Sequence, residues 1–136
     1  MQVNPYLTFN GNCREAMGFY QECLGGELSF QTIGESPLTD KMPGHMKNCL
    51  LHATLTKGEL LIAASDMVGE KGLQKGNSVS LLLNCSSEQE IRICYEKLSK
   101  DGNPTHPVEF TFWGALFGDL TDKYGNHWLL QFQKQK

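Results

Sequence analysis

The chain has 136 residues, 40% of them hydrophobic and 20% charged, which is typical of one soluble globular domain. A net charge of -3 without any stripe of Lys or Arg argues against a nucleic-acid partner. No apolar run approaches the ~20 residues that span a bilayer, so no membrane partner is expected. The N-terminus lacks the features of a signal peptide, and the five cysteines include no C-x-x-C pair. We therefore expect a cytoplasmic protein with free thiols.

The first half predicts one helix among four strands. A strand over residues 6–10 leads to a helix that Asn12 caps, with Glu15 completing a capping box. Its apolar stripe consists of Ala16, Phe19, Tyr20, Cys23 and Leu24. Gly25-Gly26 offers a left-handed stop. The further strands are expected over residues 27–33, 49–56 and 59–65, with a tight turn at Lys57-Gly58.

Two segments of the first part of the chain lack periodicity. Residues 34–47 form a long loop with two prolines and two glycines. Loops of this length can close over ligands, and this one carries Met42 and Met46; a passive surface loop is the alternative. Residues 69–77 read as a linker.

The second half repeats the pattern of the first. A strand over residues 78–84 precedes a helix that Ser87 caps, with Glu90 in the third position, and Gly102 follows its end. Strands are expected over residues 105–109, 115–121 and 127–132, the last two joined by a hairpin loop. Asn10, Tyr20 and Leu24 of the first half recur about 75 positions later as Asn84, Tyr95 and Leu98.

This duplication predicts an α+β fold in which two βαβββ modules form a curled mixed sheet around a shared cleft. We expect residues 1–136 to form a single domain, with module one at about 1–68 and module two at about 78–136.

Several motifs resemble a known superfamily. They are Tyr6 through Cys13 running into Phe19-Tyr20, Leu24 through Leu28, Ala64-Ser65-Asp66, and Phe112-Trp113-Gly114 through Thr121-Asp122-Lys123-Tyr124-Gly125. In these motifs the chain resembles the vicinal-oxygen-chelate superfamily, which includes glyoxalase I, extradiol dioxygenases and bleomycin resistance proteins, and within it the PhnB-like group. Members of that group often carry the label "demethylubiquinone methyltransferase-like". The sequence has no glycine-rich loop after a first strand, so it does not indicate methyl transfer.

The resemblance implies a divalent metal that chelates two neighbouring substrate oxygens and acts as a Lewis acid. The superfamily's four ligand positions fall here at Pro5, Ala63, Ser78 and Leu129. Three of these side chains have no donor atom, and a neutral serine hydroxyl is a poor ligand for a divalent ion. We therefore expect neither a metal nor another cofactor.

Eight residues are candidates for binding a ligand in the cleft, some by strand parity and others as aromatic wall. They are Phe9, Ser65, Ser80, Phe112, Trp113, Phe117, His127 and Gln131. Each has a purely structural alternative: the rings can pack in the core, and the polar groups can satisfy neighbouring strands.

Other residues support alternative chemistries. A displaced metal site could be formed by His52, His127 and either Glu59 or Glu109. None of the four histidines, which also include His45 and His106, shows the close spacing of a metal motif. A metal-free enzyme could use Glu109 or Asp119 as an acid-base group, while turn chemistry explains Asp122 better. Cys13 at a helix N-terminus is the one candidate for a reactive thiolate, with structural burial as the alternative.

The leading functional hypothesis is a PhnB-like protein that binds a small organic molecule in an aromatic-lined cleft without a chelated metal. The first alternative is a metal-dependent lyase or dioxygenase of the glyoxalase type, and the second is a metal-free acid-base enzyme. A homodimer is expected, since relatives commonly pair modules between chains.

Overall fold

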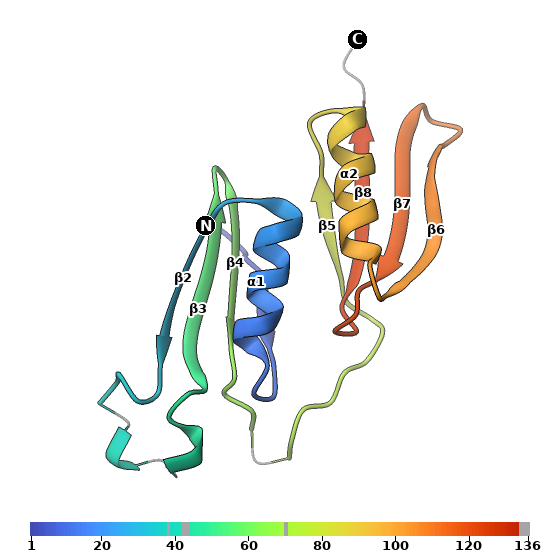
Figure 1. Cartoon of the computed structure of the whole chain (residues 1–136). Helices are drawn as coiled ribbons and strands as arrows, with labels where there is room; N and C mark the ends of the chain where they lie inside the picture. Colours follow the sequence, from blue (N-terminus) through green and yellow to red (C-terminus); the bar gives the residue numbers. More distant parts are fainter. Residues whose placement is uncertain (38, 42–43, 70, 134–136) are drawn as a thin grey trace. The chain divides into compact units, whose positions relative to one another are not determined.

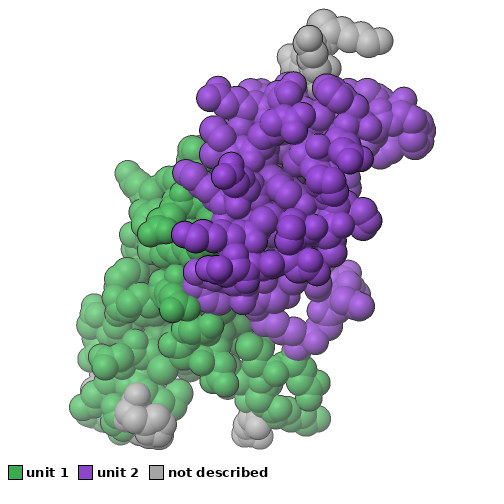
Figure 2. Space-filling model, turned by 45° about the vertical axis from the view of Figure 1, so that its right-hand side comes forward, with its two compact units in different colours: residues 1–74 green, residues 75–136 purple. Residues whose placement is uncertain are grey.

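A computed structural model describes residues 1–37, 39–41, 44–69 and 71–133 of the chain. The chain divides into two compact units, Met1–Gln74 and Lys75–Lys136, which Figure 2 shows in green and purple. The interpretation as a single domain with modules at 1–68 and 78–136 stays a prediction. No helix of the described ranges is long and apolar enough to cross a membrane.

The first unit holds one helix and one mixed four-stranded sheet (Figure 1). Its elements are β1 (Tyr6–Thr8), α1 (Cys13–Leu24), β2 (Glu27–Thr32), two short 3-10 helices at Thr39–Lys41 and Gly44–Met46, β3 (Leu50–Lys57) and β4 (Leu60–Ser65). The strand order is β1-β4-β3-β2, and β1 runs parallel to β4 while the other pairs are antiparallel.

The second unit repeats this architecture with the order β5-β8-β7-β6. Its elements are β5 (Ser80–Asn84), α2 (Glu88–Ser99), β6 (Asn103–Phe110), β7 (Ala115–Thr121) and β8 (His127–Gln133). Again the first and last strands of the unit pair in parallel. The α+β fold of two βαβββ units predicted from the sequence is confirmed, and so is the internal repeat.

Each helix packs its apolar stripe on its own sheet, and this contact forms the core of each unit. In the first unit the buried side chains include Met17, Tyr20, Ala53, Leu55 and Ile62. In the second they include Ile91, Leu98, Leu116, Trp128 and Leu130. Each sheet is thereby covered by a helix of its unit on one face.

The start of α1 differs from the prediction. Asn12 occupies the N-cap position, but its side chain makes no capping hydrogen bond, so the predicted side-chain cap by Asn12 is wrong. Instead the N–H groups of Gly11 and Cys13 donate to Oδ1 of Asp66, each at 2.9 Å. The second oxygen of Asp66 accepts the N–H of Leu50 at 2.8 Å. One buried carboxylate thus joins the helix start to the strands β3 and β4.

The start of α2 follows the prediction. Ser87 accepts the N–H of Glu90 through its hydroxyl at 3.0 Å, and the Glu90 carboxylate accepts the N–H of Ser86 at 2.9 Å. These two backbone N–H groups have no acceptor within the helix, so the two hydrogen bonds to side chains stabilise the helix start.

A glycine follows each helix at a point of close backbone approach. A Cβ atom at Gly26 would lie 2.5 Å from the carbonyl oxygen of Thr56, and one at Gly102 would lie 2.5 Å from that of Thr121. Gly26 also has a φ of +101°, whereas Gly102 has no positive φ. Glycine is therefore needed at position 102 because a side chain would clash with the backbone of Thr121, and not because the helix ends in a left-handed conformation.

Two further boundaries differ from the prediction. The tight turn between β3 and β4 consists of Gly58-Glu59, because Lys57 still pairs with Leu60, and Gly58 supplies the positive φ of 59°. Strand β6 is longer than predicted and contains Pro104 and Pro107. It lies at an edge of the sheet, where a missing N–H costs no ladder hydrogen bond.

We predict that Asp66→Asn lowers the free energy of unfolding by about 2 kcal/mol, because the amide NH₂ cannot accept the buried N–H of Leu50. Urea unfolding followed by circular dichroism measures this change. Asp40→Asn, at an exposed carboxylate, is the matched control and should leave the midpoint unchanged. Equal midpoints for Asp66→Asn and wild type would contradict this role of Asp66.

Candidate functional site

The two faces of the second sheet are distinguished by Gly118 in the middle of β7. A Cβ atom there would lie 3.1 Å from the ring of Tyr95 on α2, so position 118 faces the helix. Side chains alternate along a strand, and Phe117 and Asp119 therefore project from the opposite face. We call this opposite side the distal face.

Strand register extends the distal face over three neighbouring rows. In one row Phe117 pairs with Gln131, which pairs with Asn84. In the next row Asp119 pairs with Leu129, which pairs with Leu82. In the third row Thr121 pairs with His127, which pairs with Ser80.

Four of the eight predicted ligand-binding residues therefore share the distal face. They are Ser80, Phe117, His127 and Gln131. Nδ1 of His127 lies 2.8 Å from the Thr121 hydroxyl, and the Gln131 amide donates to Asn84 at 3.3 Å. Strand parity predicted that Ser80, His127 and Gln131 face one way, and Phe117, predicted as an aromatic wall, lies on the same face. Ligand binding by these residues stays a prediction.

The other four predicted residues lie elsewhere. Phe112 and Trp113 sit in the connection between β6 and β7, their rings T-shaped at 4.9 Å, and they are 98% and 52% exposed. Phe9 and Ser65 belong to the first unit and are buried, with exposures of 1% and 2%. The Ser65 hydroxyl accepts the N–H of Met67. Phe9 and Ser65 therefore lie in the core of the first unit. The exposed rings of Phe112 and Trp113 are accessible to a ligand or a partner.

The superfamily's metal positions carry no suitable donors in this geometry. Ala63 pairs with Tyr6 and its N–H donates to the carbonyl of Pro5, so the first two positions are neighbours that offer only carbon side chains. In the second unit Leu129 pairs with Leu82, and Ser78 precedes the first residue of β5. These residues do not fit a chelated divalent ion.

The histidines proposed as displaced ligands belong to different units. His52 lies on β3 with its ring 6.0 Å from that of Tyr6, and His127 lies on β8. Over the described ranges, no three His, Cys, Asp or Glu side chains are grouped closely enough to hold a metal ion. The side chain of His45 lies outside the described part of the structure.

Asp119 is held by two neighbours on strand β6. Nδ1 of His106 lies 2.8 Å from Oδ2 and 3.0 Å from Oδ1, and the Thr105 hydroxyl donates to Oδ1. Burial raises the pKa of Asp119, but the hydrogen bonds from Thr105 and His106 and the charge of His106 outweigh it, so the pKa lies below its usual value. Asp119 is therefore ionised near neutral pH and serves as an acceptor. Glu109, the other acid-base candidate, is exposed and pairs with Phe117.

Asp122 organises the hairpin between β7 and β8. It is buried, and Oδ1 accepts the N–H groups of Tyr124 and Asn126. Oδ2 accepts the indole N–H of Trp128 at 2.8 Å. The predicted turn role of Asp122 is confirmed, and its carboxylate also satisfies the buried Trp128.

Cys13 is not a reactive thiolate. Its side chain is fully buried, and burial together with the negative charge of Asp66 raises its pKa to about 12. The structure therefore favours structural burial of Cys13 over a thiolate stabilised by the helix dipole, and the carboxylate that caps α1 lies beside the same helix end.

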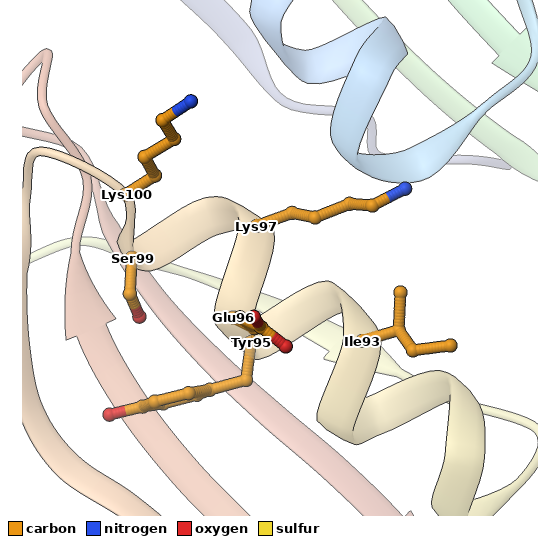
Figure 3. Close-up of a pocket in the computed structure, with 6 residues that line it drawn as sticks. All are labelled: Ile93, Tyr95, Glu96, Lys97, Ser99 and Lys100. Carbon is orange, nitrogen blue, oxygen red and sulfur yellow. The ribbon is translucent and has the colours of Figure 1, made fainter.

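A separate hollow of about 600 Å³ lies along α2 (Figure 3). It is lined by Ile93, Tyr95, Glu96, Lys97, Ser99 and Lys100. Lys97 and Lys100 extend away from Tyr95 and Ser99, so the polar groups do not converge on one point. A specific small-molecule site needs convergent polar groups, which makes the distal face the better candidate.

Sequence reasoning missed two features of this region. It assigned no role to His106, although strand pairing across the hairpin of β6 and β7 places it opposite Asp119. A regular register counted from Phe110 and Leu116 would place Pro107 opposite Asp119, so the register shift between His106 and Glu109 hid the pair. It also assigned Asp66 no contact with α1, because the two are far apart in sequence.

Residues 1–131 match the model of a family described as 3-demethylubiquinone-9 3-methyltransferase. Protein YjdN of Escherichia coli K12 is 30% identical over 149 residues, which cover 100% of this chain and 98% of that protein.

Several solved structures are similar to this chain over nearly its whole length. The crystal structure of protein PA1353 from Pseudomonas aeruginosa has 34% identity and a TM-score of 0.87, with 99% of both chains covered. A putative 3-demethylubiquinone-9 3-methyltransferase, PhnB protein, from Bacillus cereus has 27% identity and a TM-score of 0.76, with 97% of this chain and 99% of that chain covered. A glyoxalase-related enzyme from Fulvimarina pelagi, at 20% identity and a TM-score of 0.63, shares the fold, with 98% of this chain and 89% of that chain covered.

We predict that iodoacetamide labels Cys13 of the native protein at pH 8 roughly a thousandfold more slowly than an unperturbed thiol, because almost none of it is thiolate. Peptide mapping by mass spectrometry measures the rate, and urea should restore fast labelling. Asp66→Asn should keep Cys13 slow, since burial is the larger cause of the raised pKa. Native labelling as fast as in urea would contradict this assignment.

Proposed function

Because the chain belongs to the 3-demethylubiquinone-9 3-methyltransferase family and, within the vicinal-oxygen-chelate superfamily, to its PhnB-like group, we propose that it binds a small organic molecule without a chelated metal. The binding surface in this proposal is the distal face of the second sheet. Methyl transfer is not part of the proposal, since neither sheet has the parallel nucleotide-binding topology.

The observation that carries the proposal is the surroundings of Leu129. At this superfamily metal position the distal face presents Leu129 beside Leu82, which is 54% exposed. Two leucines in neighbouring strands cannot coordinate a cation, but they can contact the carbon skeleton of a ligand. The position is thus suited to apolar contact in place of chelation.

Polar and aromatic groups around the leucines would give the ligand an orientation. Phe117 offers a ring on one side, and Gln131, His127 and Ser80 offer hydrogen-bonding groups in the flanking rows. An apolar patch with a few placed polar groups is the usual composition of a small-molecule site.

We also propose that the chain forms a homodimer, as expected for this superfamily. Exposed large apolar side chains of the second unit support this, since their burial against a partner would be favourable. They are Val79, Leu82, Phe110, Phe112 and Trp113. Sedimentation equilibrium should give twice the mass of 15.2 kDa, and Trp113→Ser combined with Phe112→Ser should shift it toward one chain. A monomeric wild-type protein at all concentrations would contradict the proposal.

Ligand binding and metal content are tested together on untagged protein. We predict that elemental analysis finds no stoichiometric zinc, nickel, manganese or iron. A thermal-shift screen of aromatic acids, phenols, phosphonates and antibiotics, repeated with a chelator, should give hits that the chelator leaves unchanged. A ligand at 100 times its Kd adds about 2.7 kcal/mol of stability, or on the order of 10 °C.

A pair of variants locates the binding surface. Leu129→Glu introduces a charge on the distal face and should weaken binding of a hit by roughly tenfold or more. Ile93→Glu introduces the same charge at the hollow along α2 and should leave binding unchanged. The reverse pattern, or a bound metal that the ligand requires, would contradict the proposed function.

A further inference from the structure

The pair of His106 and Asp119 has more support than an ordinary surface ion pair. The side chain of Asp119 is 25% exposed and is held by Thr105 as well as by His106. The hydroxyl of Tyr95, on α2, lies 2.8 Å from the carbonyl oxygen of His106 and 3.0 Å from that of Asp119. One tyrosine therefore fixes the backbone of both members of the pair from the core side of the sheet.

The hydrogen bond to Asp119 determines which ring nitrogen of His106 is available. An ionised carboxylate only accepts hydrogen bonds, so in the neutral imidazole Nδ1 carries the proton and Nε2 keeps its lone pair. The side chain of His106 is 76% exposed, and among the described residues none is hydrogen-bonded to Nε2. Nε2 of His106 is therefore available as a base, because the hydrogen bond of Nδ1 orients the ring and the side chain is exposed.

Apolar side chains lie on one side of the pair. Asp119 stands next to Leu129 and Leu82 in its row and next to Phe117 along its own strand. A ligand whose carbon skeleton covers these side chains would place a polar substituent at the end of the row, where His106 lies.

We propose that His106, positioned by Asp119, accepts the proton of an acidic hydroxyl group, phenolic or enolic, on a ligand bound over Leu129 and Phe117. The proton leaves the ligand oxygen for Nε2, the oxygen keeps the bonding electron pair, and the resulting imidazolium is stabilised by the Asp119 carboxylate. No oxidant, reductant or metal takes part. This inference rests on the proposed function and names the class of ligand: small aromatic or enolic compounds with an ionisable hydroxyl.

In this arrangement His106 contacts the ligand, whereas Asp119 is a positioning residue. A purely structural pair would hold β6 to β7 without influencing which ligands bind. Two measurements separate these roles: the tautomer of His106 and the preference for a ligand with an acidic hydroxyl.

The tautomer is measured on the full chain by long-range ¹H–¹⁵N correlation. Wild type should show the Nδ1–H form of His106, and Asp119→Asn should shift it toward the Nε2–H form. Glu88→Gln, which removes a carboxylate paired with Arg92 on the exposed side of α2, is the matched control and should leave the tautomer unchanged. An Nε2–H tautomer in the wild type would overturn the proposal.

The ligand preference is measured with 4-nitrophenol and with 4-nitroanisole, its methyl ether, which has no acidic proton. Wild type should bind the phenol roughly tenfold or more tightly than the ether and should raise the fraction of yellow phenolate. In His106→Gln and Asp119→Asn, the phenol and the ether should bind about equally tightly, and the affinity for the ether should be the same as in the wild type.

The outcomes separate the two proposals. If both probes bind all variants equally, the role of His106 is overturned while the proposed binding function stands. If neither probe binds the wild type, the role of His106 also falls, and the thermal-shift screen decides the proposed function separately. Thermal melts of each variant establish that it is folded.

Discussion

The packing of α2 on its sheet is the constraint from which the candidate site follows. Gly118 allows the ring of Tyr95 to approach β7 closely, so the odd-numbered residues from Phe117 to Thr121 must project from the other face. Hydrogen bonding between strands then carries this orientation to β8 and β5, where it sets Leu129, His127 and Ser80 in neighbouring rows. A side chain at position 118 would disturb both the helix contact and the arrangement of polar groups behind it.

Local patterns in the sequence predicted much of this fold. Apolar residues at helical spacing predicted both helices, and Ser87 with Glu90 predicted the start of α2, because the groups that cap it are neighbours in the chain. The start of α1 could not be predicted this way. Its cap is Asp66, more than fifty residues away, and only the formed sheet brings that carboxylate to the helix. The raised pKa of Cys13 likewise depends on the formed structure, since burial and Asp66 cause it.

In the candidate site, too, some features follow from local sequence patterns and others depend on the formed sheet. Alternation along β8 predicted that His127, Leu129 and Gln131 share a face, and the pairing with β7 confirms it. The partnership of His106 with Asp119 depends on an irregular register that no period-two pattern describes. Family resemblance assigned the metal positions as an expectation, while the chemistry of alanine, proline and leucine argued against a metal there. Resemblance and side-chain chemistry thus had to be weighed together to reach a metal-free proposal.

The strand pairing also bears on how the chain folds during its synthesis. Every ladder of the described residues joins strands from one half, and each half supplies its own helix start and its own glycine at the close approach behind the helix. The longest-range ladder of the N-terminal half joins Tyr6 to Ala63, so none of its strand pairings requires residues of the second half. The N-terminal half can therefore complete its sheet on the ribosome while the remainder is still being translated.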